Sequence, residues 1–400
     1  MLSKPVRWLA ANVLVPAAIA VVLFSVLEVG CRVAGRLGSG EWPVTEQERG
    51  TRQVRAIGAA YSLHPFLSVA GRPGAVLRLP GHVATFNSFG TRGPEVEMPK
   101  PKGRFRVVCE GGSTTFDLLA ADDASTWPAR LARELGPGAD VVNGGFPGWT
   151  SVQNLVALEL RDVDFSPDLV VVFAGINDTQ PAGHIPFFRD YSVGHGEILP
   201  RILGAVPPPL PLVSRLVFVE WLRNRIGPVP RGVDGRGYAP AWRWHGGARR
   251  DAMPEEGVDV FRRNLRSMAG VATAFGARTL VVAQTARLRT GREEADRDYL
   301  ESWTPGLTWK GYLDGVRRYN AAARQLADER VVSFFDPFPS GGFADADFAD
   351  PVHFSAAGSD RFARLLAVEV EKVRAGASVA PLANIGTGLV SPGPGQHERR

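Results

Sequence analysis

The sequence predicts a three-layer α/β/α domain around a five-stranded parallel sheet, preceded by an apolar N-terminal helix. Between residues 104 and 374, short runs that are apolar throughout alternate with segments that carry apolar residues at helical spacing. Strands of this kind are buried on both faces, as in a parallel sheet whose crossover helices cover each side. The apolar stretch Leu9–Val29 predicts the N-terminal helix, because it is long enough to span a bilayer core of about 30 Å.

The alternation defines the elements of the main domain. The predicted strands are Phe105–Cys109, Ala139–Asn143, Leu169–Ala174, Thr279–Gln284 and Val331–Phe335. The predicted helices are Thr126–Leu135, Ser151–Leu160, Asp259–Phe275, Gly311–Asp328 and Ala356–Val373. Each helix shows the period of an amphipathic helix, with one apolar face that can cover the sheet.

The composition is that of a globular protein with one main domain and some attachments. The chain has 400 residues, of which 44% are hydrophobic and 22% charged. The net charge of +5 comes mainly from arginines that are spread along the chain, and no stretch interleaves basic with aromatic residues. This pattern disfavours nucleic-acid binding. The two cysteines, Cys31 and Cys109, do not suggest a disulfide framework.

Residues 1–36 are predicted to form a single-pass membrane anchor. Two basic residues precede the apolar stretch and two follow it, so the flanking charges set the orientation only weakly. The charge of the amino terminus favours the N-terminus inside and the main domain outside. A cleaved signal peptide is the main alternative. The length of the apolar segment and the lack of an Ala-x-Ala site argue against it. Glu28 disfavours a lipoprotein site at Cys31. The position of the apolar stretch at the N-terminus disfavours a buried core helix.

The residues around the main domain are predicted to form a linker, a hairpin and a tail. Residues 37–103 comprise a linker or irregular helix and then a β-hairpin, because residues 74–87 alternate apolar and polar side chains around a Pro-Gly turn. Residues 375–400 contain glycine, serine and proline without any period, which predicts disorder.

A candidate nucleophile follows the first strand. The segment Cys109-Glu-Gly-Gly-Ser-Thr-Thr115 sets Ser113 on a glycine turn directly after an apolar run. Such a turn lifts one hydroxyl out of the carboxyl edge of the sheet, where α/β enzymes keep their sites. A Gly-Gly-Ser turn after a strand is most often only a turn. A catalytic interpretation therefore requires a base, a group that orients it, and an oxyanion pocket.

His353 is the candidate base. It lies in Asp350-Pro-Val-His-Phe-Ser-Ala-Ala-Gly358, just before the last helix. An aspartate three residues before a histidine can accept from its Nδ1–H and leave Nε2 free for the serine. The alternative is an acidic loop or a metal site made by Asp345, Asp347, Asp350 and His353. A metal site would need further ligands on another element, and none shows the expected spacing.

Two more loops at strand ends could supply oxyanion donors. Asn143-Gly-Gly-Phe-Pro-Gly-Trp-Thr-Ser151 follows the second strand, and Ala174-Gly-Ile-Asn-Asp-Thr179 follows the third. A glycine amide and an asparagine side-chain amide are suitable donors, each typically worth about 3 kcal/mol. Singly, each loop is an ordinary turn. Four loops with complementary roles at four strand ends favour an active site.

These four motifs, in this order, resemble the blocks of the SGNH hydrolases, also called GDSL lipases and esterases. The resemblance spans about residues 104–373 and implies a flavodoxin-like fold with strand order 2-1-3-4-5. It implies that Ser113 is the nucleophile and the first oxyanion amide, and that His353 is the base oriented by Asp350. Gly148 and Asn177 are then the second and third oxyanion donors, and the spacing to the Thr-Ser pair favours Gly148 over Gly145.

One residue departs from the motif that names the family. Gly112 stands where that motif has an aspartate, as in a subset that begins Gly-Gly-Ser-Thr. The missing aspartate is not the triad acid, so we expect activity without it. The hairpin, Asn87–Gly93 and the N-terminal helix also resemble a membrane-anchored bacterial subset of the family.

The long gap after the third predicted strand is predicted to be an insertion. Residues 179–254 are too many for a structureless loop, so we expect them to pack over the site as part of a lid or substrate cleft. They contain one predicted helix near Val213–Ile226. Trp221, Trp242 and Trp244 could stack on sugar rings or apolar chains, or fill a small satellite core.

The sequence therefore predicts a serine ester hydrolase in a bacterial cell membrane, with its catalytic domain outside the cytoplasm. We expect no metal and no organic cofactor. The expected substrate is a small-molecule, glycan or lipid ester, for example an O-acetylated glycan of the envelope. One alternative is an O-acyltransferase that uses the same triad, because the first half-reaction is shared. Another is a non-catalytic envelope binding module, which predicts the loss of a triad residue, whereas all three are present.

Overall fold

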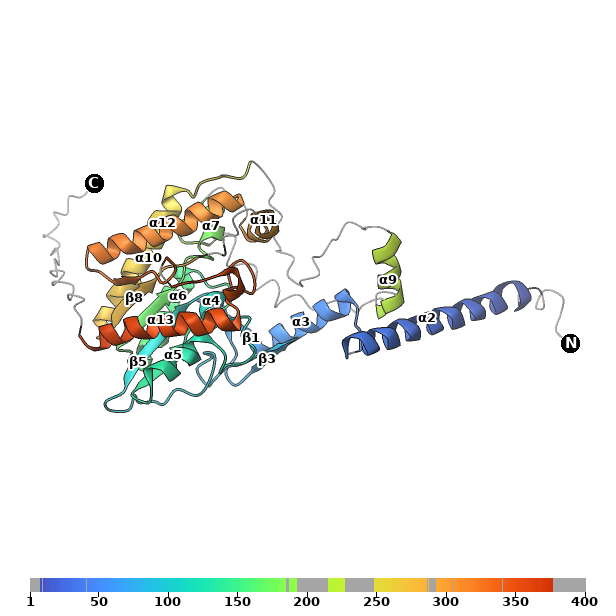
Figure 1. The fold of residues 1–400 in the computed structure, drawn as a ribbon, viewed down its shortest axis with the longest axis horizontal. Helices are drawn as coiled ribbons and strands as arrows, with labels where there is room; N and C mark the ends of the chain where they lie inside the picture. Colours follow the sequence, from blue (N-terminus) through green and yellow to red (C-terminus); the bar gives the residue numbers. More distant parts are fainter. Residues whose placement is uncertain are drawn as a thin grey trace, which may run out of the picture.

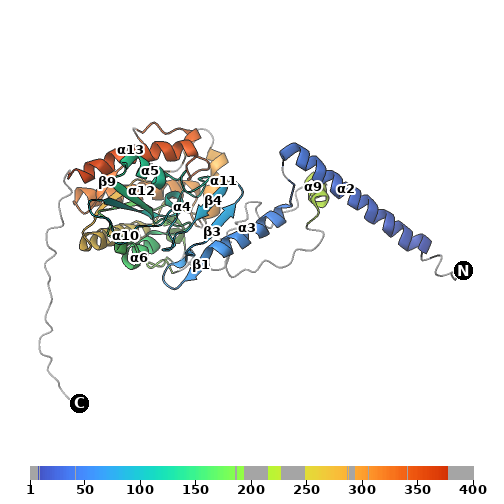
Figure 2. The same ribbon diagram turned by 90° about the horizontal axis from the view of Figure 1, so that it is seen from below.

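The computed structural model describes residues 8, 10–40, 42–184, 187–192, 215–226, 248–285, 287, 293–304, 306–339 and 341–376. An α/β body contains the sheet, and a long N-terminal helix projects away from it (Figure 1). The view from below shows the same separation between the body and this helix (Figure 2).

The central sheet has five parallel strands. They are β5 (Phe105–Gly111), β6 (Ala139–Asn143), β7 (Leu169–Phe173), β8 (Arg278–Val282) and β9 (Ser333–Phe335), and they lie in the order β6-β5-β7-β8-β9. This order is 2-1-3-4-5, which confirms the predicted fold class. Because β5 lies between β6 and β7, the loop after it lies between the loops after those two strands at the carboxyl edge.

Helices cover both faces of the sheet, which explains why the strands read as apolar throughout. One face carries α6 (Ser151–Leu160), α10 (Glu255–Ala274) and α12 (Trp309–Asp328), and the other carries α5 (Trp127–Leu135) and α13 (Ala356–Arg374). Alternate residues of β7 serve the two cores: Val170 and Val172 pack with α10 and α12, whereas Val171 and Phe173 pack with α5 and α13. Each buried side chain of this size contributes about 1.5–3 kcal/mol.

Several helices and strands begin at other residues than predicted. The last strand is shorter than predicted, because Val331 and Val332 pack into the core with α10 and α12 before β9 begins. The helix α12 begins two residues earlier than predicted, since the Thr308 side chain caps it by accepting from the Gly311 amide. The sequence interpretation also missed α11 (Glu293–Trp303), whose Leu300 packs against α12.

The extension before the sheet is more regular than predicted. The predicted hairpin is present as β3 (Val76–Leu79) and β4 (His82–Thr85). It is preceded by α3 (Glu46–Ala60) and by a second hairpin, β1 (Tyr61–His64) and β2 (Ser68–Gly71), which the sequence interpretation missed.

The regularity of α3 has local and tertiary causes. A capping box in which Thr45 and Glu48 bind each other's amides starts the helix. Its last turn buries Ile57 and Ala60 against Phe146 of the body. A segment that shows no clean apolar period is thus held as a helix by its cap and by contacts with residues far along the chain.

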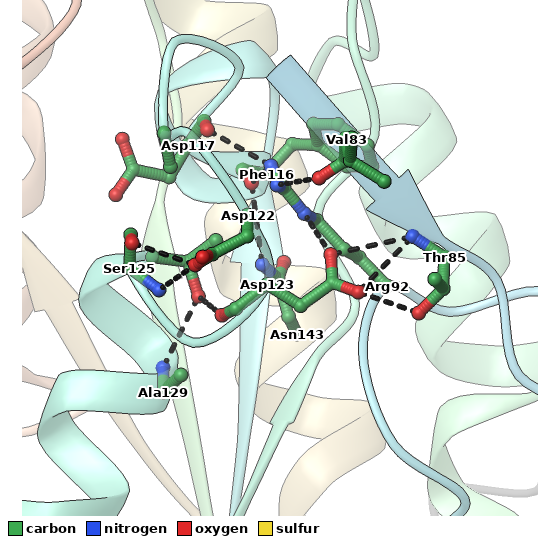
Figure 3. Close-up of polar contacts among 12 residues, drawn as sticks. Val83, Thr85, Arg92, Phe116, Asp117, Asp122, Asp123, Ser125, Ala129 and Asn143 are labelled. Carbon is green, nitrogen blue, oxygen red and sulfur yellow. Dashed lines mark hydrogen bonds and ion pairs between the residues drawn. The ribbon is translucent and has the colours of Figure 1, made fainter. Parts of the chain in front are cut away.

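Arg92, drawn in Figure 3, ties this extension to the body. Its side chain is 1% exposed and donates to the carbonyl oxygens of Phe116 and Asp117, at the C-terminal end of α4 (Ser113–Phe116). The guanidinium also pairs with Asp123 at 2.8 Å. Arg92 therefore links the extension to the short helix that begins with the candidate nucleophile.

The N-terminal helix comprises η1 (Ala10–Leu14) and α2 (Val15–Ser39). By length and composition the segment Asn12–Ser39 is able to cross a membrane, with a hydropathy of 2.4 over its most apolar window. None of that window is buried, whereas the core helix of a soluble domain would be mostly buried. A signal sequence shares these features with a membrane span.

The described part of the predicted insertion lies in two places. The short helix α7 (Thr179–Gly183) is buried in the body, whereas α9 (Val217–Ile226), which matches the predicted helix, lies beside α2 (Figures 1 and 2). The rings of Phe24 and Phe218 meet edge to face, with their centroids 5.7 Å apart.

Other predictions for this part of the chain remain untested. Trp221 lies on α9, stacks on Phe218 and is 46% exposed. Trp242 and Trp244 fall outside the described residues, as does most of the 375–400 tail. The lid role of the insertion and the disorder of the tail therefore stay predictions.

Candidate active site

The candidate nucleophile stands where β5 meets α4. Ser113 is the first residue of α4, and two glycines connect it to the strand. A Cβ atom on Gly111 would lie 2.3 Å from the carbonyl oxygen of Phe173, and one on Gly112 would lie 2.4 Å from Nδ2 of Asn177. The turn therefore needs glycine at Gly111, where a side chain would meet backbone, whereas a side chain at Gly112 would fit only if the Asn177 side chain moved.

The predicted triad residues come together. His353 Nε2 lies 2.8 Å from Ser113 Oγ, and His353 Nδ1 lies 2.7 Å from Asp350 Oδ2. The other Asp350 oxygen accepts the amides of Val352 and His353 at 2.9 and 2.8 Å. An ionised carboxylate only accepts, so Nδ1 carries the proton and Nε2 accepts the serine hydroxyl. This is the tautomer that a general base requires.

The electrostatics of the pair favour the same state. Burial alone would raise the pKa of Asp350, but the charge on His353, with hydrogen bonds from its ring and backbone and from Val352, lowers it below its ordinary value. Burial alone would lower the pKa of His353, but the attraction and hydrogen bond of Asp350 outweigh this and raise it. Asp350 therefore stays ionised and favours the protonated form of His353.

Two predicted oxyanion donors lie at the same cavity as Ser113. Gly148, whose φ is +85°, and Asn177 both line it together with Ser113 and His353. Among the described residues, the amides of Ser113 and Gly148 have no hydrogen-bond acceptor, so both are available to a ligand. Asn177 Nδ2 donates to the Trp149 carbonyl at 2.9 Å, which fixes the amide group and leaves its second N–H free.

The alternative donor, Gly145, is committed elsewhere. Its amide donates to Asn143 Oδ1 at 3.2 Å. A Cβ atom there would lie 2.7 Å from both the Phe116 amide nitrogen and Thr115 Cβ, so Gly145 packs against α4 and not against the cavity. The geometry favours Gly148.

Asp178 fixes the two donor loops to each other. It follows Asn177 directly, is fully buried, and accepts the Ser151 amide at 3.1 Å and the Ser151 hydroxyl at the start of α6. Ser151 in turn accepts from Asn264 at 2.8 Å. Burial raises the pKa of Asp178 to about 6, although the hydrogen bonds from Ser151 oppose this rise. Asp178 thus joins the Asn177 loop to the loop that carries Gly148.

The cavity in front of Ser113 has a volume of about 990 Å³. Next to the triad its wall includes Leu118, Ile176, Leu300 and Val352, which offer an apolar surface for an acyl chain. The described end of the insertion contributes Thr179 and Gln180 of α7. The wall also includes the C-terminal end of α2 and one side of α3, so the N-terminal extension shapes the cavity.

Sequence reasoning missed the contribution of α11. Tyr299 of this helix donates to Asp350 Oδ2 at 3.3 Å, and Leu300, Trp303 and Thr304 line the cavity. A signal was present, since three large apolar or aromatic residues lie within one and a half turns. The acidic first half of the segment concealed it.

The alternative of an acidic metal site receives no support from the geometry. Asp347 accepts the Ala344 amide at 2.8 Å and pairs with Arg361, so it closes its own loop. No group of three or more His, Cys, Asp or Glu residues able to hold a metal ion occurs in the part of the chain that the structure describes. Both cysteines have free thiols.

Comparison with known proteins places this chain in a family. Residues 109–361 match the model of the GDSL-like lipase/acylhydrolase family. This match covers more than half of the chain, so the protein belongs to that family and is an ester hydrolase. No curated protein matches the sequence.

Several solved structures are similar to this chain. One is a GDSL-like lipase from Bacteroides thetaiotaomicron, with 16% identity over 69% of this chain and 93% of that chain, at a TM-score of 0.40. A carbohydrate acetylesterase from Sinorhizobium meliloti has 16% identity over 68% and 100% of the two chains, at a TM-score of 0.39. A lipase/acylhydrolase from Enterococcus faecalis has 15% identity over 67% and 96%, at a TM-score of 0.38.

The raised pKa of Asp178 predicts how stability changes with pH. Between about pH 4 and 6 the native state keeps the proton of Asp178, whereas the unfolded chain releases it. The carboxyl therefore stabilises the fold at low pH, and this stabilisation is lost as the pH rises through about 6. The free energy of unfolding of the wild type, minus that of Asp178→Asn, should fall by up to about 3 kcal/mol from pH 4 to 7. Urea unfolding of the full-length protein in detergent measures it.

Asp360→Asn is the matched control. Slight burial opposes the change, but Arg130 and Arg364 hold the pKa of Asp360 below its ordinary value. The corresponding difference for this variant should therefore rise with pH only below about pH 4 and stay nearly flat from pH 4 to 7. An equal fall from pH 4 to 7 for both variants would contradict the assignment.

Proposed function

We propose that this protein cleaves acyl esters with Ser113 as nucleophile, His353 as general base and Asp350 as the residue that orients His353. The observation that carries the proposal is the continuous chain of hydrogen bonds from Ser113 Oγ through His353 to Asp350, at 2.8 and 2.7 Å. A serine hydroxyl is a weak nucleophile until a base accepts its proton, and this chain supplies the base in the required tautomer.

The reaction proceeds in two halves. Ser113 Oγ attacks the ester carbonyl carbon while its proton moves to His353 Nε2. The amides of Ser113 and Gly148 and Nδ2 of Asn177 donate to the oxyanion. Collapse of this intermediate breaks the bond to the alcohol, which leaves with the proton from His353. A water molecule, deprotonated by His353, then attacks the acyl-enzyme, and the acid and free Ser113 are released.

The N-terminal helix is assigned as a membrane anchor. Its apolar side chains are exposed around the helix, as at Val21 (66%), Val22 (60%) and Val26 (63%). A bilayer is the environment that would cover such a surface. The envelope location of the catalytic domain follows from the flanking charges of the sequence and belongs to the same proposal.

The first test is the turnover of p-nitrophenyl acetate by the full-length protein in detergent. Ser113→Ala should lower kcat/KM by more than about 10³-fold, because the nucleophile is lost while the fold stays intact. Ser88→Ala, which alters an exposed hydroxyl in the extension, should match the wild type. Equal rates for the wild type and Ser113→Ala would refute the proposed mechanism.

The second test concerns the oxyanion pocket. In Gly112→Ala the new Cβ atom should displace the Asn177 amide from its place, since the two would otherwise lie 2.4 Å apart. The loss of one donor typically lowers kcat by about 10²–10³-fold, and steady-state kinetics on the same ester measures it.

A matched glycine exists on a helix far from the site. Gly270 of α10 has open space where a Cβ atom would stand, so Gly270→Ala should leave kcat unchanged. If Gly112→Ala retained the activity of Gly270→Ala, the close approach of Gly112 to the Asn177 amide would not matter for turnover.

A further inference from the structure

Three arginines line the same cavity as Ser113. Arg49 and Arg52 lie one turn apart on α3, and Arg78 lies on β3, the strand against which α3 packs. All three are exposed to solvent and come from the extension, outside residues 109–361 that match the family. They are therefore a feature that this chain adds to the hydrolase fold.

None of these three guanidinium groups is neutralised within the described residues. No ion pair or side-chain hydrogen bond holds Arg49, Arg52 or Arg78 there. Buried or half-buried arginines of the body behave differently, as the pairs of Arg92 with Asp123 and of Arg287 with Asp296 show.

The charges around the cavity are unbalanced as well. Among the described residues that line it, Asp350 is the single carboxylate, and the His353 ring and two backbone amides occupy its oxygens. The cavity thus carries a positive potential at the end formed by α3 and β3. A cleft with one sign of charge concentrates ligands of the opposite sign.

The positive end also lies beside the N-terminal helix. Ser39, the last residue of α2, and Trp42 and Pro43 after it line the cavity with the arginines. If α2 spans a membrane, this end of the cavity stands near the bilayer surface, and Ser113 lines the same cavity. An anionic group would then be held at one end while an ester reaches the nucleophile.

We propose that Arg49, Arg52 and Arg78 form an anion-binding subsite, and that the natural substrate carries a phosphate or carboxylate group in addition to the ester cleaved at Ser113. The role of this subsite in turnover rests on the proposed function, the cleavage of an ester at Ser113. Guanidinium groups bind both anions by paired N–H donors, and a phosphate has enough oxygens to engage more than one arginine. Leu118 and Leu300 line the same cavity and offer apolar contacts for the chain that joins the anion to the ester.

Binding is tested without turnover. Full-length Ser113→Ala protein in phosphatidylcholine nanodiscs is titrated calorimetrically with hexyl phosphate and, separately, with hexanol. Hexyl phosphate should bind in a saturable way and hexanol should not. The double variant Arg49→Gln/Arg52→Gln should weaken hexyl phosphate binding about tenfold, and Arg49→Lys/Arg52→Lys, which keeps the charge, should weaken it less. Raising sodium chloride to 0.5 M should weaken it as well.

The matched control lies on the same helix. Arg55 is an exposed arginine of α3 that does not line the cavity, so Arg55→Gln should bind hexyl phosphate like the parent protein. Hexyl phosphate binding that is equal in Arg49→Gln/Arg52→Gln and in Arg55→Gln would overturn the subsite, as would the absence of binding.

A kinetic experiment separates the subsite from the proposed function and identifies the source of the anion. Wild-type protein in nanodiscs hydrolyses neutral p-nitrophenyl butyrate while hexyl phosphate is added, or while phosphatidylglycerol replaces phosphatidylcholine. Inhibition by phosphatidylglycerol points to a lipid headgroup, and inhibition by hexyl phosphate alone points to a soluble anionic ester. Inhibition by neither contradicts the subsite.

The two failures remain distinguishable. If the wild type does not turn over p-nitrophenyl butyrate, the proposed function fails while the calorimetric result still decides the subsite. If the ester is cleaved but hexyl phosphate does not bind, only the subsite fails.

Discussion

The hydrogen bond between Ser113 Oγ and His353 Nε2 joins residues that are 240 positions apart. It forms only because β5 and the loop before α13 end at the same edge of the sheet. Parallel pairing imposes this, since every strand of such a sheet points its carboxyl end the same way. The place of β5 between β6 and β7 then brings the Gly148 loop to one side of Ser113 and the Asn177 loop to the other.

Buried polar residues behind the site hold these loops at the distance that the chemistry needs. Asp178 binds the start of α6, and through it the loop after β6 is joined to the loop after β7. Beneath the Gly148 loop, Glu110 is fully buried, and burial together with the nearby Asp162 carboxylate raises its pKa well above the ordinary value. Arg161 pairs with Asp162 at 2.6 Å. The proposed donors are thus held in place by the fold itself, which is the condition for strong oxyanion stabilisation.

Sequence reasoning found the parts of the site that local chemistry identifies. A glycine turn after an apolar strand, Asp350 three residues before His353, and an asparagine after a Gly-Ile pair are recognisable without a fold. The alternation of apolar runs and helices predicted the three-layer α/β/α domain, and the strand order came from the resemblance to the SGNH hydrolases. Tyr299 was missed, because its helix shows apolar residues only in its second half.

Other features depend on contacts between distant segments and could not be read locally. The helix α3 shows no clean period, and its position depends on the burial of Ile57 and Ala60 against the body. The exposed arginines of α3 and β3 resemble any solvated face until the fold places them in the cavity of Ser113. The role of Arg92, which links the extension to α4, likewise appears only when its four partners are brought together.

The most direct test of the account is to locate the reactive residue chemically. The full-length protein is treated with a fluorophosphonate, digested, and mapped by tandem mass spectrometry. The account predicts one adduct, on Ser113 Oγ, which forms rapidly in the wild type and is strongly slowed in His353→Ala, because the base that activates the serine is then missing. An adduct on a different serine, or labelling of Ser113 that is as fast without His353, would contradict it.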